Sequence, residues 1–340
     1  MKSRREFLKE AATSVALLGS AAAADKLALA GILDAHAAQT AGKSKVVVAR
    51  DASLHGTGAQ PDEQRVLNLL DKAMAAYTGR QKPVEAWKSV IPAAILAGKT
   101  IGLKVNGLGG RGISTHAALT LAIAERLQQA GVKAGNIVVW DQNAHFLEAC
   151  GMTISTDPSR IRCYPADSAG FDDEESSWGV AKIRLTKILT RDCAMVINLP
   201  ILKDHQMAGV TFSMKNMYGV VDKPFLLHGN NCNPGVADLN CIPAIREKVS
   251  FTIGDAISSV YDGGPSFHPE RLWYPNALVV GEDRVALDQT AWQMIEQKRA
   301  EAGMRTLEAV GRPPRYIATA ADSSHKLGTN DPQRIRLMEV

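Results

Sequence analysis

The cysteines of this 340-residue chain are few, and none has the spacing of a haem or iron–sulfur motif. There are five, an odd number, with no CxxC pair, no CxxCH sequence and no ferredoxin-like run. These absences argue against c-type haem and against a ferredoxin-type iron–sulfur cluster. Cys232 and Cys241 are close enough in sequence to form a disulfide in an oxidising compartment. Cys150 and Cys193 lie in apolar contexts and are expected to be buried thiols.

Other signals are also missing. No basic run with interleaved aromatic residues occurs, and the net charge is only +4, so nucleic acid is not an expected partner. Beyond the N-terminal segment, no stretch is long and apolar enough to cross a bilayer, and no stable membrane span is expected. There is no G-x-S-x-G sequence and no cysteine placed as a nucleophile, which disfavours serine or cysteine hydrolysis. A composition of 46% hydrophobic and 22% charged residues is typical of a globular protein with a sizeable core.

The N-terminus carries a specific pattern. Residues 3–9 read SRREFLK, and an alanine-rich segment of moderate hydropathy follows. This resembles a twin-arginine signal peptide, which is an address read by a receptor rather than a membrane anchor. We therefore expect residues 1–37 to be the signal, the twin-arginine translocase to be a partner during export, and the mature protein to be periplasmic. A basic tail on a cytoplasmic protein is the alternative.

The order of the expected elements indicates an α/β fold. Strand, glycine-rich loop, helix and strand follow one another within residues 100–140, which is a βαβ unit and implies parallel strands with a right-handed crossover. We predict a largely parallel, doubly wound sheet with helices on both faces. It forms a single domain over residues 45–340, with a peripheral C-terminal segment from about residue 303. Further strands are expected at 45–50, 161–164, 181–185, 195–199, 249–255 and 276–281, and helices at 86–96, 114–129, 237–247 and 283–302.

The glycine-rich loop at residues 107–112 follows the second of these strands. Its pattern is neither G-x-G-x-x-G nor a P-loop, so nucleotide binding is not favoured. Anion binding by the loop amides and the following helix N-terminus is the preferred interpretation.

Polar side chains follow several of the expected strands. In a doubly wound sheet the carboxyl ends of the strands share one edge, and ligands bind there. Side chains far apart in the sequence can therefore converge on one site. Those at strand ends are Lys104, Asn106, Asp141, Lys203, His205, Asp255 and Asp262, and those between strands are Lys215, Asn216 and His228.

One interpretation of this set is an anion site. Lys104, Lys203 and Lys215 would hold a carboxylate or phosphate, while His205 or His228 transfers a proton. The alternative for the lysines is a solvated or salt-bridged surface position. The expected catalytic residues are His205, Lys215 and His228, and the expected ligand-binding residues are Lys104, Asn106, Lys203 and Asn216.

The other interpretation is a divalent metal site. Imidazole and carboxylate ligands from His205, His228, Asp255 and Asp262 would suit zinc, iron or manganese. No H-E-x-x-H spacing supports this set, so it depends on tertiary convergence. Hydrogen-bonded loop histidines and strand-end carboxylates are the alternative.

The chain resembles a family catalogued as domain of unknown function 362 over roughly residues 46–299. The residues that carry the resemblance are an N-L-P-x-x-K-x-H pattern at 198–205 and M-K-N-M-Y-G at 214–219, with the D-G-G-P turn at 262–265 and D-R-V-A-L-D at 283–288. The resemblance implies an α/β fold with a shared polar site, but no agreed activity. Some relatives add a ferredoxin-like module that this chain lacks, and Asp204 stands where relatives often have threonine.

Together these features predict an exported periplasmic protein that binds a small anionic ligand. We expect an enzyme that uses lysine and histidine acid–base chemistry, with a divalent metal as a further option. The alternative is a non-catalytic binding protein or an accessory protein that assembles with an exported redox complex.

Overall fold

The computed structural model describes residues 42–55 and 60–340. Residues Ser44–Val340 form one compact unit. The expected signal at residues 1–37 lies outside the described residues. Within the described part of the chain, no helix combines the length and the apolar character needed to cross a membrane.

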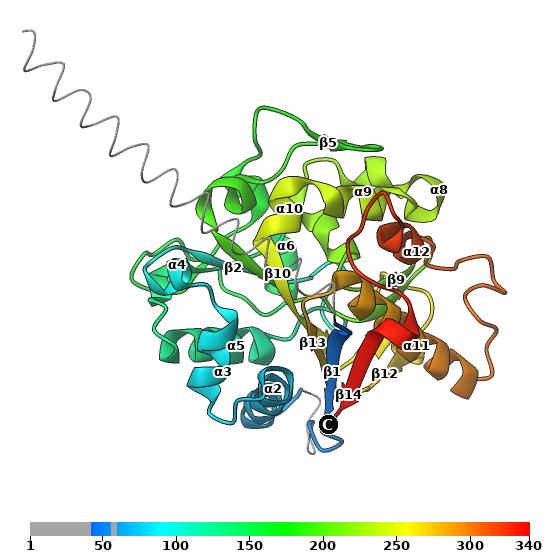
Figure 1. The fold of residues 1–340 in the computed structure, drawn as a ribbon, viewed down its shortest axis with the longest axis horizontal. Helices are drawn as coiled ribbons and strands as arrows, with labels where there is room; N and C mark the ends of the chain where they lie inside the picture. Colours follow the sequence, from blue (N-terminus) through cyan, green and yellow to red (C-terminus); the bar gives the residue numbers. More distant parts are fainter. Residues whose placement is uncertain (1–41, 56–59) are drawn as a thin grey trace, which may run out of the picture. The chain divides into compact units, whose positions relative to one another are not determined.

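An eight-stranded sheet forms the centre of this unit, with strand order β14-β1-β13-β10-β7-β2-β3-β4 (Figure 1). Strand β13 runs antiparallel to both of its neighbours, and the other pairs are parallel. The predicted α/β fold with a largely parallel sheet is therefore confirmed. The strands are β1 (Ser44–Arg50), β2 (Ile101–Lys104), β3 (Ile137–Trp140), β4 (Arg162–Cys163), β7 (Met195–Asn198), β10 (Val249–Ala256), β13 (Ala277–Gly281) and β14 (Ile335–Glu339).

Helices and short hairpins connect these strands. The helices are α2 (Glu63–Thr78), α3 (Pro83–Val90), α4 (Ala93–Leu96), α5 (Ala117–Gln129), α6 (Ala144–Ala149), α7 (Ala166–Ala169), α8 (Gly229–Cys232), α9 (Gly235–Cys241), α10 (Pro243–Lys248), α11 (Arg284–Glu301) and α12 (Tyr316–Ala321). The short strands are β5 (Ser176–Trp178), β6 (Ala181–Ile183), β8 (Lys203–His205), β9 (Gly209–Thr211), β11 (Ser259–Val260) and β12 (Leu272–Trp273). Six short helical turns complete the described part: η2 (Ala134–Asn136), η3 (Ile188–Asp192), η4 (Lys215–Val220), η5 (Pro224–His228), η6 (Pro269–Arg271) and η7 (Pro332–Arg334).

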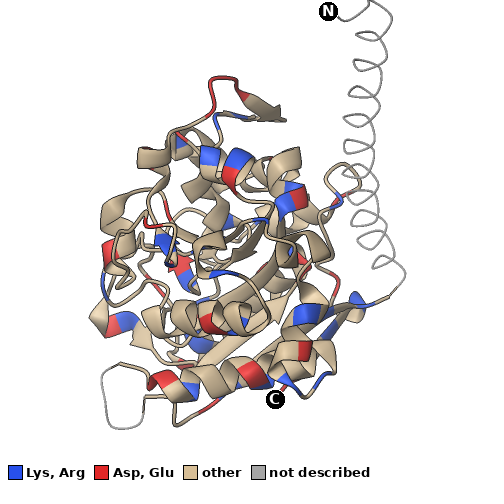
Figure 2. Ribbon diagram, turned by 90° about the vertical axis from the view of Figure 1, so that its left-hand side faces the viewer, with Lys and Arg blue, Asp and Glu red and all other residues tan. Residues whose placement is uncertain are grey.

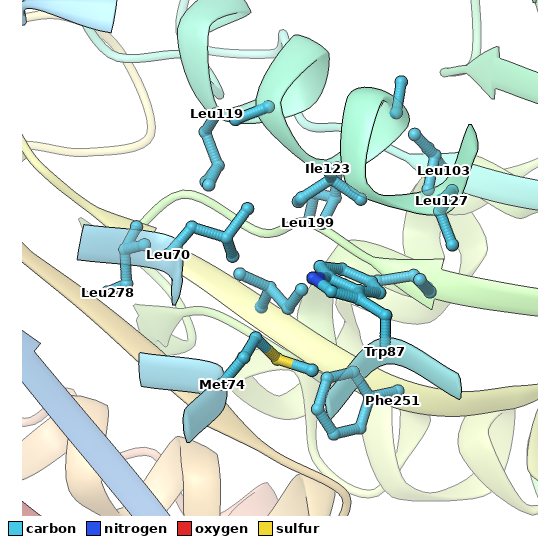
Figure 3. Close-up of a cluster of buried hydrophobic side chains, with 14 of the residues drawn as sticks. Leu70, Met74, Trp87, Leu103, Leu119, Ile123, Leu127, Leu199, Phe251 and Leu278 are labelled. Atoms are coloured by element: carbon cyan, nitrogen blue, oxygen red, sulfur yellow. The ribbon is translucent and has the colours of Figure 1, made fainter. Parts of the chain in front are cut away.

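Successive side chains of a strand point to opposite faces of a sheet, and both faces of this sheet are covered. Leu103 belongs to a buried cluster with Trp87 and Leu119, from α3 and α5 (Figure 3). Trp140 packs on the opposite face, in a second cluster that includes residues of α9, α10 and α12. Helix α11 covers β1 and β13 on that second side through Leu287. Helices on both faces follow from apolar residues at both alternating positions of the strands.

The longest helices begin at aspartate caps. Asp62 accepts a hydrogen bond from the amide of Arg65 at the start of α2. Asp283 does the same for Val285 and Ala286 at the start of α11. Each cap satisfies amides that have no acceptor within their own helix.

Several expectations need correction. The C-terminal segment is not peripheral, because β14 pairs in parallel with β1 at the sheet edge and Tyr316 is fully buried. Residues Lys203–His205, beyond the expected strand at 195–199, form a further short strand, β8, which pairs with β9 in a hairpin. The helix expected at 237–247 is divided into α9 and α10, because Pro243 starts a new helix.

The two cysteines that are close enough in sequence to form a disulfide are not bonded to each other. Cys232 and Cys241 are both free thiols, and each is buried. Cys150 and Cys193 are free and buried as well, as their apolar contexts indicated.

Acidic and basic residues are interspersed on the ribbon (Figure 2). Three lysines, Lys104, Lys203 and Lys215, are nevertheless buried in the interior.

Candidate functional site

The edge where the parallel strands end carries most of the predicted polar residues. Strands β10, β7, β2 and β3 are adjacent and parallel, so their carboxyl ends lie side by side. Lys104 and Asn198 are the last residues of β2 and β7 and are register partners. Asp141 directly follows β3. The strand order therefore brings these three buried side chains together.

Lys104 is held by a carboxylate. Its Nζ donates to Asp141 Oδ1 at 2.7 Å and to the carbonyl of Val105 at 2.7 Å. Both side chains are almost completely buried, at 1% and 4% exposed. The other carboxylate oxygen of Asp141 accepts from the amide of Gly107 at 2.8 Å. The first amide of the glycine-rich loop is therefore already bound to a side chain of the protein.

Close packing fixes that loop. A Cβ on Gly107 would lie 1.9 Å from the carbonyl oxygen of Phe146, so only glycine fits. At this position the glycine serves close backbone approach to α6.

Two asparagines link the lysines. Asn106 Nδ2 donates to Asn216 Oδ1 at 2.9 Å, and Asn106 Oδ1 accepts from Lys203 Nζ at 3.1 Å. Asn216 Nδ2 donates to Asn198 Oδ1 at 2.7 Å. Lys104 Nζ also reaches Asn216 Oδ1 at 3.3 Å. The predicted ligand-binding residues thus form one continuous buried network.

Lys203 and Lys215 differ from Lys104 in having no ion-pair partner among the residues that the structure describes. Burial, opposed by the charge of Asp141 and aided by the charges of Lys215 and Lys104, lowers the pKa of Lys203 to about 7. Burial also lowers the pKa of Lys215 to about 7. Lys215 Nζ lies 3.4 Å from His228 Nε2 and 3.3 Å from the ring centroid of Tyr218. Of these three buried lysines, only Lys104 is paired with a carboxylate, Asp141, among the described residues.

The two predicted histidines lie beside these lysines, with ring centroids 6.0 Å apart. His205 Nδ1 accepts from the amides of Met207 and Ala208 at 3.1 and 3.2 Å, so the proton of the neutral ring is on Nε2. His228 Nδ1 lies 3.0 Å from the carbonyl of Pro224, an acceptor, so its Nε2 is unprotonated and faces Lys215.

The pKa values of both histidine rings are lowered by their surroundings. Burial, followed by the charges of Lys215, His228 and Lys203, lowers the pKa of His205 to about 2. Burial and Lys215 also lower the pKa of His228, which is half-buried. Both rings are neutral at neutral pH. His205 can donate from Nε2, and His228 can accept at Nε2.

The four predicted metal ligands do not lie together in the structure. Asp262 Oδ1 is held by Arg299 at 2.7 Å and by Arg312 at 2.9 Å. Asp255 is bound to His116. Across the described residues, no three histidines, cysteines or carboxylates are grouped as metal ligands would be. His205 and His228 lie side by side, but Asp255 and Asp262 do not join them. The predicted metal site formed by these four residues is therefore wrong.

A buried carboxylate positions the segment that carries Lys215. Asp288 accepts from the amides of Ser213 and Met214 at 2.6 and 3.2 Å. Burial raises the pKa of Asp288 to about 7, although these two amide bonds oppose the shift. Helix α11 thus fixes the start of η4.

The sequence did not indicate two further residues at this edge. Arg312 binds both carboxylate oxygens of Asp204 at 3.0 Å and so anchors β8 beside His205. Burial nevertheless raises the pKa of Asp204 to about 6. His116, the residue that starts α5, binds Asp255. Arg312 lies in the segment expected to be peripheral, and His116 lies within the helix expected at 114–129, so neither had a local signal.

Comparison with known proteins identifies the family. The model of a family described as "Domain of unknown function (DUF362)" matches residues 101–293. The chain belongs to the DUF362 family. The matched range contains the lysines, asparagines and histidines of the site.

Other comparisons add little. No match was found among curated proteins. Four chains of solved structures match, and one is a crystal structure of a protein from Thermotoga maritima, with a TM-score of 0.45 and 12% identity. That match covers 71% of this chain and 60% of the other, so the DUF362 chain spans less than two thirds of its length.

Proposed function

We propose that this DUF362 protein is an exported periplasmic protein that binds a small anionic ligand and transfers a proton on it. The observation that carries the proposal is the pair of buried lysines, Lys203 and Lys215, with no carboxylate partner in the described structure. A buried charge is costly unless it is paired. An anion bound between the two amines would supply the missing charge and would raise the pKa of both lysines. Binding would therefore take up protons near neutral pH.

The surrounding residues suit acid–base chemistry on such an anion. His228 is half-buried and its unprotonated Nε2 is directed to Lys215, so it is the expected proton acceptor. His205, which is neutral and carries its proton on Nε2, is expected to hold the anion by donating a hydrogen bond. Lys104, Asn106 and Asn216 hold Lys203 in place through the amide network. The expected reaction class is proton transfer on a small carboxylate or phosphate.

The anion site is tested by thermal unfolding with inorganic phosphate, acetate and malonate. A ligand at 100 times its Kd stabilises the folded state by about 2.7 kcal/mol, which raises Tm by roughly 4 °C for a domain of this size. We expect such a shift in the wild type and its loss in Lys203→Met and Lys215→Met.

The control for this test is Lys248→Met. Lys248 is a partly buried lysine whose Nζ donates to the carbonyls of Leu189 and Thr190, both at 2.8 Å, outside the site. It should keep the full shift. A wild type that no anion stabilises, or a shift that survives in both site variants, would refute the proposal.

Export is proposed from the SRREFLK pattern at residues 3–9. Twin-arginine receptors require the arginine pair. We expect the wild type in the periplasmic fraction and the Arg4→Lys/Arg5→Lys variant in the cytoplasmic fraction. Equal distribution of both proteins would contradict export by this route.

A further inference from the structure

One buried carboxylate outside the lysine network orders two other reactive groups. Asp255 is fully buried. Its Oδ2 accepts from the backbone amide of His116 at 2.8 Å and faces His116 Nδ1 at 2.9 Å. Its Oδ1 accepts from the amide of Ile257 at 3.0 Å. Asp255 thereby fixes both the imidazole of His116 and the turn that carries Ser258.

The proton positions in this group follow from the acceptors. A carboxylate only accepts, so His116 Nδ1 carries the proton and donates to Asp255. In the neutral ring, Nε2 is then unprotonated. It lies 3.5 Å from Ser258 Oγ, a separation within the looser range seen before substrate binds. The serine hydroxyl can therefore donate to His116.

We propose that Ser258, His116 and Asp255 form a nucleophile, base and orienting acid that cleave small carboxylic esters. Ser258 Oγ attacks the ester carbonyl, and its proton passes to His116 Nε2. The ester C–O bond then breaks, the leaving alcohol takes that proton, and an acyl group remains on Ser258. Water, deprotonated by His116, attacks this acyl group, releasing the carboxylic acid and restoring the serine.

The backbone amides at the start of α5 would bind the oxyanion that forms in such a reaction. His116 immediately precedes this 13-residue helix. The amides of its first turn have no acceptor within the helix and carry partial positive charge, which is what a developing oxyanion requires. These amides are the backbone groups nearest in sequence to the base.

The basicity of His116 fits the role. Burial lowers its pKa, but the charge and hydrogen bond of Asp255 outweigh burial, so the pKa of His116 lies above its usual value. This contrasts with His205, whose neighbours are cations. The His116 side chain is 15% exposed and Ser258 is 4% exposed, so access is restricted to small esters.

Such a set is recognised by geometry rather than by chain order or a local motif. The absence of G-x-S-x-G excludes a nucleophile elbow, but it does not exclude residues that meet through the fold. None of the three belongs to the lysine network, so this proposal does not depend on anion binding there.

The test is labelling of the purified protein with diisopropyl fluorophosphate, read by intact mass and peptide mapping. We expect one adduct on Ser258, none in Ser258→Ala, and labelling at least about 100-fold slower in His116→Gln, since a positioned base contributes 10²–10⁴-fold. Hydrolysis of p-nitrophenyl acetate should fall in parallel.

The matched control is Ser259→Ala, which removes the adjacent, fully buried serine and should label as the wild type does. Folding of each variant is checked by circular dichroism. No adduct on the folded wild type, an adduct on another residue, or unchanged labelling in folded His116→Gln would each overturn the proposal. Should His116→Gln fail to fold, His116→Asn replaces it, and the wild-type arm alone still decides.

Discussion

Replacing Lys104 with methionine is expected to lower the free energy of unfolding by about 3–5 kcal/mol, whereas the same change at Lys203 is expected to raise it by about 1–4 kcal/mol. The two lysines lie in one network and are equally buried. Lys104 neutralises Asp141, and its loss would leave a buried carboxylate that, within the described part of the chain, is bound by only the amides of Gly107 and Gln142. Among the described residues, Lys203 Nζ has only Asn106 as its hydrogen-bond partner, so methionine would remove an uncompensated charge and keep the volume.

Urea denaturation of both variants measures this contrast. The double variant Lys104→Met/Asp141→Asn removes both charges and should recover much of the lost stability. If Lys203→Met loses as much stability as Lys104→Met, then Lys203 is stabilised by a charge that the geometry does not reveal. If Lys104→Met leaves the free energy of unfolding unchanged, Asp141 is not a buried charge in the folded protein.

The convergence of the polar side chains could be predicted because it follows from strand order. Lys104, Asn106 and Lys203 follow strands that are adjacent and parallel, so the shared edge places them together. Lys215 and Asn216 could also be predicted because, like Lys203, they lie in the segment that follows β7. The contact of Asn216 with Asn198, and that of Asp288 with the amides before Lys215, depend on side-chain register, which a sequence pattern does not encode.

The functions of individual groups were less predictable. Asp255 and Asp262 have the residue type and strand-end position of metal ligands, but His116 and two arginines from distant segments bind them. Likewise, histidine usually titrates near neutral pH, but the buried cations around His205 lower its pKa to about 2. In both cases the outcome is set by neighbours that are remote in sequence.

The stability of the wild type is expected to contain a component that rises by about 3 kcal/mol between pH 7 and pH 8.5, and this component should be missing in Lys203→Met/Lys215→Met. The folded pKa of each lysine is about 7, against an ordinary value of 10.5. Above pH 7 the folded lysines lose their protons while the unfolded chain keeps them. Stability rises with pH wherever the unfolded state binds more protons, and each lysine contributes roughly 1.5 kcal/mol over this window.

Comparison with the double variant isolates the two lysines, because the other shifted groups titrate in both proteins. Burial raises the folded pKa of Asp288 to about 7, which makes stability fall as pH rises toward that value, opposite in sign to the lysines. Each single variant should lose about half of the rise. Equal pH dependence in the wild type and the double variant, measured by urea denaturation in phosphate-free buffer, would mean that the amines remain charged when folded. Saturating anion should also abolish the rise in the wild type, because a paired ammonium retains its proton to higher pH.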